Sequence, residues 1–279
     1  MDLSFRLINA FAASDDPFSG NAICVFDDAA GLDADQMSRL AQQMNIECAF
    51  LIETSSSAAT IAIEVPLSDM KLSASSIIGA AHVISQMHQT REEMVITVGD
   101  TQIKARPEGK DNWTIPAAPA TTRKLKSTPQ ILSSLVGLQM SAISGEVMVV
   151  ESTRSGVVLP VASPEDVRRT RLDARMLHSY AMLLNTEPQI YVWSKREDGS
   201  IESRMFYGPG GGVIEVAATG SGAANLGAWL AVHGEFGRRR IYQGAAVGRP
   251  SMVDLEVKES GQVLVGGHIN QVAAGTFTL

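Results

Sequence analysis

Two short runs of small residues have the composition of anion-binding helix starts. The first is residues 73–76 (SASS), and the second is residues 219–222 (TGSG). Each run opens a predicted helix, where small side chains leave the backbone N–H groups of the first turn within reach of a ligand. Those donors and the positive end of the helix dipole favour a carboxylate or a phosphate. Ordinary capping and tight helix packing explain the same residue types, so both interpretations stay open.

Hydrophobic periodicity and turn residues predict the elements that position these two runs. In the first half the predicted elements are strands 3–11 and 22–26, a helix over 32–44, strands 48–53 and 59–65, a helix over 73–89, and strands 93–98, 101–107 and 112–117. In the second half they are strands 147–152 and 156–162, a helix over 163–184, strands 189–194 and 201–208, a helix over 218–234, and strands 252–257 and 262–269.

Strands, a helix, strands and a helix of small residues thus occur twice in the same order, which predicts a duplicated α+β fold. Chance similarity of two α/β halves is the alternative. The Pro- and Ala-rich stretch 116–122 is typical of a linker. We therefore expect an N-terminal half over residues 1–118 and a C-terminal half over residues 119–279, with the last strand able to pack on the first half. If a pseudo-twofold axis relates the halves, the two helix starts can face one cleft.

Composition narrows the class of protein. The 279 residues carry 23 Lys and Arg against 30 Asp and Glu, a net charge of −7, which is no electrostatic footprint for nucleic acid or an anionic membrane. Two cysteines make neither a disulfide framework nor a metal-ligand spacing. The first 20 residues lack the basic start of a signal peptide, and no apolar run approaches 18 residues. We expect a soluble protein of the reducing cytoplasm.

Other residues with chemical potential favour structural roles. The run GPGGG at 208–212 lacks the spacing of nucleotide-binding loops, and ATGSGAA is not a serine nucleophile elbow. His82 and His88 are six residues apart, on opposite sides of a predicted helix, which makes a poor metal pair. Cys48 is predicted to be a small buried hydrophobe, with a catalytic thiol as the lesser alternative. Arg249 can provide a cation for an acidic ligand or hold the C-terminal region together.

Four motifs together resemble one known family. They are INAFAASDDPFSGNAICVF at 8–26, MNIECAFL at 44–51, GVIEVAATGSGAA at 212–224 and QGAAVGRPS at 243–251. From end to end the chain resembles the phenazine-biosynthesis isomerase (PhzF-like) family, within the diaminopimelate-epimerase-like fold. The resemblance implies two pseudo-symmetric domains, each a curved, mostly antiparallel sheet wrapped around a central helix, with the active site in the cleft between them. It also implies a homodimer with no organic cofactor and no metal.

The resemblance also implies a set of site residues. Glu47 falls on the family's catalytic glutamate, and its apolar neighbours suit a carboxyl whose pKa is raised by burial. The chain departs from the family at Ala74-Ser75, where the family has Gly-His, and at Val216-Ala217, where it has Asp-Pro. The expected substrate-binding residues are Ser75, Ser76, Thr219, Gly220, Ser221 and Asp69, the last of which stands where the family has a glutamate.

Two function hypotheses follow. The first is a cofactor-independent isomerase or tautomerase that moves a proton on a small unsaturated or cyclic carboxylic acid, with Glu47 as the proton shuttle. The second is a catalytically decayed PhzF-like protein that binds a ligand or a partner, motivated by the departures at Ser75 and Val216.

Racemase relatives of the fold use two facing thiols at the helix starts. Serine and Thr-Gly stand at those places here, and a hydroxyl is too weak an acid to replace a thiol.

Overall fold

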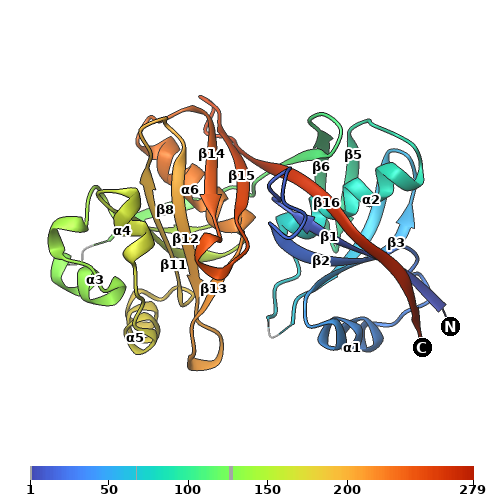
Figure 1. Ribbon diagram of the computed structural model, residues 1–279, viewed down its shortest axis with the longest axis horizontal. Helices are drawn as coiled ribbons and strands as arrows, with labels where there is room; N and C mark the ends of the chain where they lie inside the picture. The colour runs from blue at the N-terminus through green and yellow to red at the C-terminus, as the bar shows by residue number, and fades with distance from the viewer. Residues whose placement is uncertain (1, 67, 126–127) are drawn as a thin grey trace. The chain divides into compact units, whose positions relative to one another are not determined.

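The computed structural model describes residues 2–66, 68–125 and 128–279, and the chain forms two compact units (Figure 1). The first unit contains Met1–Pro116 and Val265–Leu279, and the second contains Ala117–Leu264. The first unit therefore ends at Pro116 in this part of the chain, whereas the sequence predicts the boundary between residues 118 and 119. The segment from Val265 onward, however, belongs to the first unit, because its strand pairs along the whole of the N-terminal strand.

The first unit is a sheet that closes on itself. Its strands lie in the order β1-β2-β3-β4-β5-β6-β7-β16, and β16 pairs back onto β1. Strands β2 and β3 pair in parallel, as do β4 and β5, whereas the pairs β1–β2, β1–β16, β3–β4, β5–β6 and β6–β7 are antiparallel. The strands are β1 (Asp2–Ala10), β2 (Asn21–Phe26), β3 (Glu47–Thr54), β4 (Ala58–Glu64), β5 (Met94–Val98), β6 (Thr101–Pro107), β7 (Asn112–Pro116) and β16 (Val263–Thr278).

Helix α2 (Ala74–Met87) is the centre of this unit and packs against β1, β2, β3, β5, β6 and β7 (Figure 1). Its residues 75–84 are all buried, which explains why the sequence is small and apolar around the whole helix instead of along one stripe. At Gly79 a Cβ atom would collide with the Ile8 side chain on β1, so glycine lets the helix approach that strand closely. The sheet therefore fixes the position of the α2 N-terminus.

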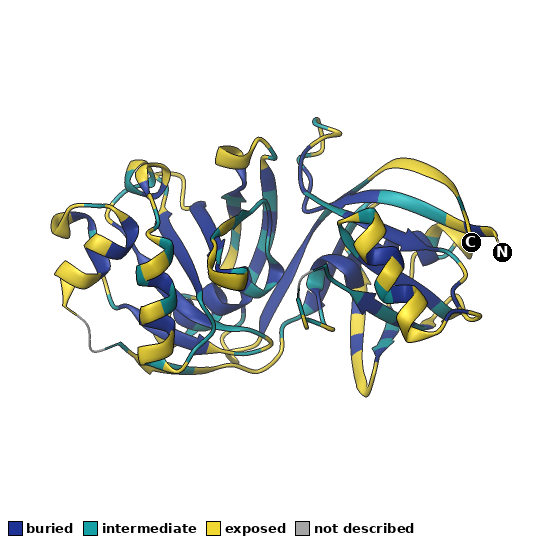
Figure 2. Ribbon diagram, turned by 90° about the horizontal axis from the view of Figure 1, so that it is seen from below, coloured by how far each residue is buried: buried dark blue, intermediate teal, exposed yellow. Residues whose placement is uncertain are grey.

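Helix α1 (Ala34–Met44) covers the other face of the same sheet. Its Met37, Leu40 and Ala41 pack on a cluster that includes Phe26 and Phe50, whose rings stack at 4.9 Å. Figure 2 shows the resulting alternation, with exposed outer faces on the surface helices and buried strands beneath them.

The second unit has a sheet in the order β15-β14-β12-β11-β10-β9-β8, with β13 paired to β12. Helix α6 (Gly220–Val232) packs on β8, β9, β10 and β15. The strands are β8 (Thr121–Lys124), β9 (Met148–Glu151), β10 (Ser155–Pro160), β11 (Gln189–Lys195), β12 (Ile201–Tyr207), β13 (Ile214–Val216), β14 (Gly237–Gln243) and β15 (Ser251–Val257). The other helices are α3 (Pro129–Val136), α4 (Pro164–Arg169) and α5 (Ala174–Leu184), with short 3₁₀ turns at Met140–Ala142, Pro209–Gly211 and Ala245–Val247.

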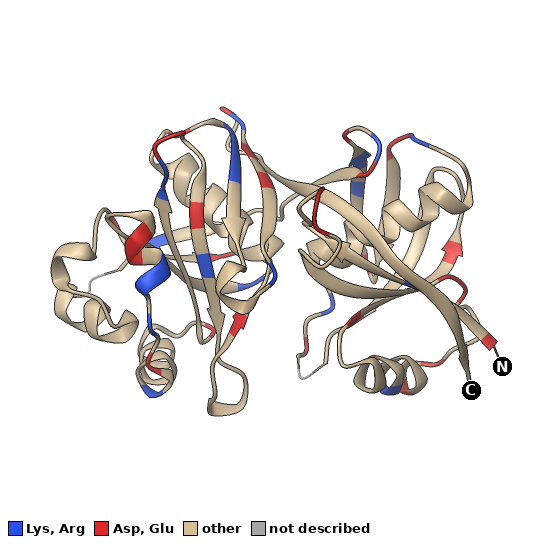
Figure 3. Cartoon of the chain, in the orientation of Figure 1, with Lys and Arg blue, Asp and Glu red and all other residues tan. Residues whose placement is uncertain are grey.

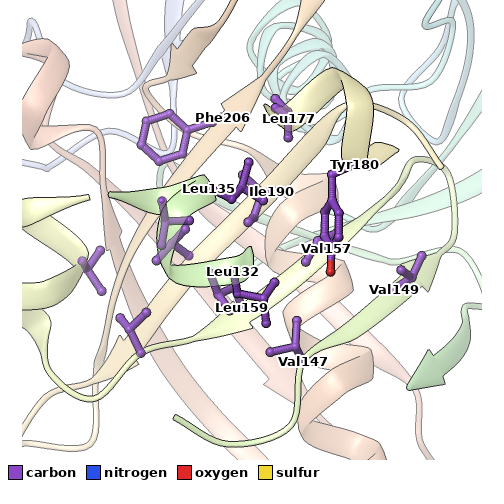
Figure 4. Close-up of a cluster of buried hydrophobic side chains, with 14 residues drawn as sticks. Leu132, Leu135, Val147, Val149, Val157, Leu159, Leu177, Tyr180, Ile190 and Phe206 are labelled. Atoms are coloured by element: carbon purple, nitrogen blue, oxygen red, sulfur yellow. The ribbon is translucent and has the colours of Figure 1, made fainter. Parts of the chain in front are cut away.

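Both faces of β11, a central strand of this second sheet, are covered. Ile190 and Val192 join a hydrophobic cluster with Leu132 and Leu135 of α3 and with α5 (Figure 4). Trp193, the residue after Val192, points to the other face and meets Trp229 of α6 edge to face, with ring centroids 5.0 Å apart. The apolar run of β11 is therefore continuous because neither face meets solvent. The mixed α+β architecture, a mostly antiparallel sheet around a central helix in each unit, confirms the predicted fold class.

Several predicted elements differ from the structure. The helix expected over 163–184 is two helices, because the backbone N–H groups of Arg171 and Asp173 bond to carbonyls of Val136 and Leu135 in α3. Strand β8 begins inside the stretch 116–122 interpreted as a linker and continues beyond it, and helix α3 was not predicted. Strand β14 was also missed, because Arg238 and Arg240 make it look like solvated surface. Their partners, Glu256 and Asp254, lie across the sheet on β15.

Charges of both signs are interspersed over each unit (Figure 3). Helix α4 has Glu165 and Asp166 in its first turn and Arg168 and Arg169 in its last, which matches the helix dipole. Within the described residues, every helix is too short or too polar to cross a membrane.

Candidate active site

Glu47 begins strand β3 in the first unit, and its carboxyl group lies against the first turn of α2. Ser76 Oγ donates a hydrogen bond to Glu47 Oε1, and Ser75 Oγ donates to Oε2 at 3.4 Å. The N-cap residue of α2, Ser73, makes no side-chain capping bond of the usual local kind among the described residues. A helix start normally takes its hydrogen-bond acceptor from the side chain of its own N-cap residue. In α2 that acceptor is instead the carboxyl group of Glu47, on strand β3.

Two residues complete this group: Asn21, which was not among the expected site residues, and Ser73, which was named only as part of the run 73–76. Asn21, the first residue of β2, lies 3.4 Å through Nδ2 from both Glu47 Oε2 and Ser75 Oγ. Ser73 Oγ lies 3.1 Å from Ser75 Oγ. Strands β2 and β3 are parallel and pair Ile23 with Glu47, which brings the start of β2 beside the carboxyl. The motif at 8–26 contains Asn21 and could have pointed to it. Its contact with Glu47, however, depends on how β2 pairs with β3, which the local sequence does not reveal.

Burial raises the pKa of the Glu47 carboxyl above its ordinary value of 4.5. Hydrogen bonds from the Ser73, Ser75 and Ser76 side chains and from the Ser76 backbone N–H favour the charged form and offset part of that rise. The two influences oppose each other, and burial is the larger, so the net direction is a raised pKa. A carboxyl in this condition can both accept a proton and return it.

Cys48 follows Glu47 on β3, and its side chain points to the opposite face of the sheet. There it joins Cys24, its partner in the β2–β3 register, in the buried cluster beneath α1. The hydrogen bond with the Cys24 thiol, followed by burial, raises the pKa of the Cys48 thiol far above its usual range. Cys48 thus stays a protonated, buried thiol, in agreement with the prediction of a small hydrophobe.

The second predicted helix start, in the second unit, is capped by its own residue. Thr219 is the N-cap of α6, and its Oγ1 accepts a hydrogen bond from Gly222 N at 3.3 Å. Ser221 Oγ lies 3.0 Å from Thr219 Oγ1. A Cβ at residue 222 would lie 2.6 Å from both the Tyr191 ring and the Thr219 methyl group, so glycine is needed there. The capping interpretation is therefore correct for Thr219, and binding of a ligand by Thr219, Gly220 and Ser221 stays a prediction.

The most specific sequence motif, QGAAVGRPS, supports the segment that leads into α6. Gln243 Nε2 donates to the Val216 carbonyl oxygen at 2.8 Å. Gly244 has a φ of +80°, and a Cβ there would collide with the carbonyl oxygens of Arg249 and Ala217. Ser251 Oγ donates to the same Arg249 carbonyl at 2.9 Å. These contacts favour the structural interpretation of the motif.

Glu215, from the signature before α6, is held by a buried ion pair. Arg204 of β12 donates through Nε to Oε1 at 2.9 Å and through Nη2 to Oε2 at 2.6 Å. Its Nη1 donates to the Thr170 carbonyl at the end of α4, at 2.7 Å. A bidentate arginine of this kind fixes orientation as well as charge, so Glu215 ties β13 to the neighbouring elements and is not available as a general base.

The remaining predicted residue, Asp69, is exposed and lies outside the helices and strands. Its predicted role in substrate binding stays a prediction. The described residues also include no cluster of three or more His, Cys, Asp or Glu side chains arranged to hold a metal ion.

Comparison with known proteins gives a consistent result. The family model for phenazine biosynthesis-like proteins matches residues 8–275. An uncharacterized isomerase of Pasteurella multocida is 27% identical over 98% of this chain and 93% of its own. Trans-2,3-dihydro-3-hydroxyanthranilate isomerase of Pseudomonas chlororaphis is 30% identical over 89% of this chain and 88% of its own.

Solved structures show the same fold. A PhzF-family phenazine biosynthesis protein of Bacillus anthracis covers all of both chains with a TM-score of 0.85 at 16% identity. A hydroxyproline epimerase of Agrobacterium vitis covers 99% of this chain and 92% of its own with a TM-score of 0.61 at 12% identity. The chain therefore belongs to the phenazine biosynthesis-like family, whose relatives named here are isomerases, and it has the epimerase-like fold.

Proposed function

We propose that this protein is an isomerase or tautomerase that moves a proton on a small unsaturated or cyclic carboxylic acid, with Glu47 as the proton carrier. The observation that carries the proposal is the Glu47 carboxyl at the start of α2, with a pKa raised by burial and hydrogen-bond donors on both oxygens. The named isomerases among its relatives support the reaction class.

In this reaction the Glu47 carboxylate removes a proton from a carbon next to the unsaturated system. The C–H bond breaks, its electron pair enters the conjugated system, and an O–H bond forms on Glu47. The neutral acid then returns the proton to another carbon of the same system, so that the double bond moves and the composition is unchanged. A carboxyl whose pKa is raised toward the operating pH serves both half-steps, which contributes roughly 10²–10⁴-fold.

Part of the hypothesis remains a prediction from the sequence. Thr219, Gly220 and Ser221 are proposed to bind the acid group of the substrate, since the first turn of α6 offers backbone donors and small side chains. We also propose, from the family resemblance, a cytoplasmic homodimer that works without an organic cofactor or a metal. Light scattering on the purified protein tests the dimer.

The test is proton exchange in heavy water. The protein is incubated with a panel of unsaturated, keto and dihydroaromatic acids, and each compound is followed by proton NMR. We expect deuterium to enter one class of acid as its double bond moves. Glu47→Gln should abolish this exchange, whereas Glu53→Gln, a change of the exposed glutamate on the same strand, should leave it intact.

Two other outcomes have distinct meanings. Full turnover in the Glu47→Gln variant would overturn the role of Glu47. Tight binding of an acid with no exchange in any compound would favour the alternative, a binding module that has lost its chemistry. The complete set of hydrogen bonds around Glu47 argues for the enzyme, because a decayed site has no need of a desolvated acid.

A further inference from the structure

The two oxygens of the Glu47 carboxyl have unequal surroundings. Oε1 accepts from Ser76 Oγ, whose backbone N–H also bonds to the carboxyl group. Oε2 has Ser75 Oγ and Asn21 Nδ2 as partners, both at 3.4 Å, which is near the outer limit for a hydrogen bond. The first oxygen is thus anchored to the helix, and the second is held by contacts that are easily exchanged.

Burial distinguishes the same residues. Ser76 has no exposed surface, and Ser75 is 5% exposed. Asn21 and Glu47 are only partly buried. A ligand can reach the Glu47 and Asn21 side, but the Ser76 hydroxyl is enclosed and already engaged by Oε1. The Ser76 hydroxyl therefore acts on Glu47. From the sequence, Ser76 is expected to bind the substrate directly, and its enclosed position does not fit that role.

We propose that Ser76 is a positioning residue, which anchors Oε1 of Glu47 so that Oε2 is the oxygen that exchanges the proton with the substrate. The inference rests on the proposed function of Glu47 and adds to it the working atom and the residue that orients it. Ser75 and Asn21 are the partners that Oε2 leaves when it takes the proton.

The anchor has two consequences for the carboxyl. The Ser76 hydroxyl on Oε1, together with the Ser76 backbone N–H that bonds to the same carboxyl group, restricts rotation of the group, so Oε2 keeps a constant direction. The same bonds favour the charged form. Loss of the Ser76 hydroxyl should therefore raise the pKa of Glu47 further and let the carboxyl rotate, and both effects reach the substrate only through Glu47.

The test is Ser76→Ala beside Ser85→Ala. Ser85 lies on the same helix and bonds to the carbonyl of His82, so its variant controls for the loss of a helix hydroxyl away from Glu47. Ser76→Cys, which keeps the volume but weakens the hydrogen bond, serves as the second variant if alanine prevents folding. The pKa of Glu47 is read from the carbon-13 chemical shift of its labelled carboxyl group, a measurement that needs no substrate.

For Ser76→Ala we expect a higher pKa of Glu47, an acidic limb of the pH–rate profile moved to higher pH, and kcat lower by on the order of tenfold to a hundredfold with KM unchanged. Ser85→Ala should match the parent protein in all three. An unchanged Glu47 pKa in Ser76→Ala would overturn the anchor, and a higher KM with unchanged kcat would make Ser76 a substrate-binding residue. Full turnover in Glu47→Gln would instead overturn the proposed function, and this inference with it.

Discussion

The starts of α2 and α6 are built from the same kinds of residue and are used differently. In both, the N-cap hydroxyl lies beside the hydroxyl two residues later, at 3.1 Å between Ser73 and Ser75 and at 3.0 Å between Thr219 and Ser221. In α6 the N-cap also accepts the backbone N–H of the third helical residue, Gly222. In α2 the third helical residue is Ser76, and it donates to Glu47 instead.

This difference shows how two helix starts with similar residues acquire different chemistry. One helix start receives a titratable carboxyl from a neighbouring strand, so its dipole and donors act on an acid that belongs to the protein. The other is satisfied by its own neutral cap, and the first turn stays free of acidic residues. Among the described contacts, the start of α2 thus has a titratable partner in Glu47, and the start of α6 has a neutral hydroxyl cap.

The largest expected effect is on stability, and it comes from disrupting the turn at Gly244, which packs on the segment that leads into α6. Gly244→Ala places a methyl group against two carbonyl oxygens at a positive φ, which should cost about 2–5 kcal/mol of unfolding free energy. Gly248→Ala has a similar φ of +73° with open space around it, so it should cost only about 1–2 kcal/mol. Urea denaturation of the two variants measures the difference in unfolding free energy. Equal losses of stability would mean that the contact of the new methyl group with the two carbonyl oxygens is not what makes Gly244→Ala costly.

The sequence was sufficient for the broad plan and for part of the site. Periodicity located both central helices, and the resemblance located Glu47 and the serines at 75 and 76. The hydrogen bonds between these serines and Glu47 could not be predicted. Helix capping is normally local, and here the capping acceptor comes from a different element, strand β3. The position of Asn21 depends in the same way on the β2–β3 register. The pattern of β14 was misleading because the charges that its arginines meet lie on β15.

A smaller effect separates the two N-caps. Thr219→Ala removes a capping hydrogen bond and should cost about 1 kcal/mol of unfolding free energy without changing the pKa of Glu47. Ser73→Ala removes no such cap, but it removes a hydrogen bond that favours the charged form of Glu47, so it should raise the pKa of that carboxyl. Denaturation together with the carboxyl carbon-13 titration measures both quantities. A Glu47 pKa that moves in Thr219→Ala, or stays fixed in Ser73→Ala, would contradict the assignment of separate roles.

The smallest effect is the pH dependence of stability, and it should come from α2 alone. Below the ordinary pKa of 4.5, Glu47 is protonated in both the folded and the unfolded chain and contributes no slope. As the pH rises above 4.5 the unfolded chain releases the proton first, because burial raises the pKa of Glu47 in the folded state. The folded state then binds more protons, so the contribution of Glu47 to folding stability falls with rising pH until its folded pKa is passed.

Glu47→Gln removes this titration, and the stability of that variant relative to the parent should therefore increase as the pH rises from 4.5. Thr219→Ala, which changes a helix start without an acid, should give a curve parallel to the parent at all pH values. Urea denaturation at constant ionic strength between pH 4 and pH 8 provides the three curves. A Glu47→Gln curve parallel to the parent would mean that the pKa of Glu47 is the same in the folded protein as in the unfolded chain, which contradicts the raised pKa. In that case the contacts of Ser73, Ser75 and Ser76 with Glu47 would amount to an ordinary helix cap, and the two helix starts would be alike in chemistry as well as in sequence.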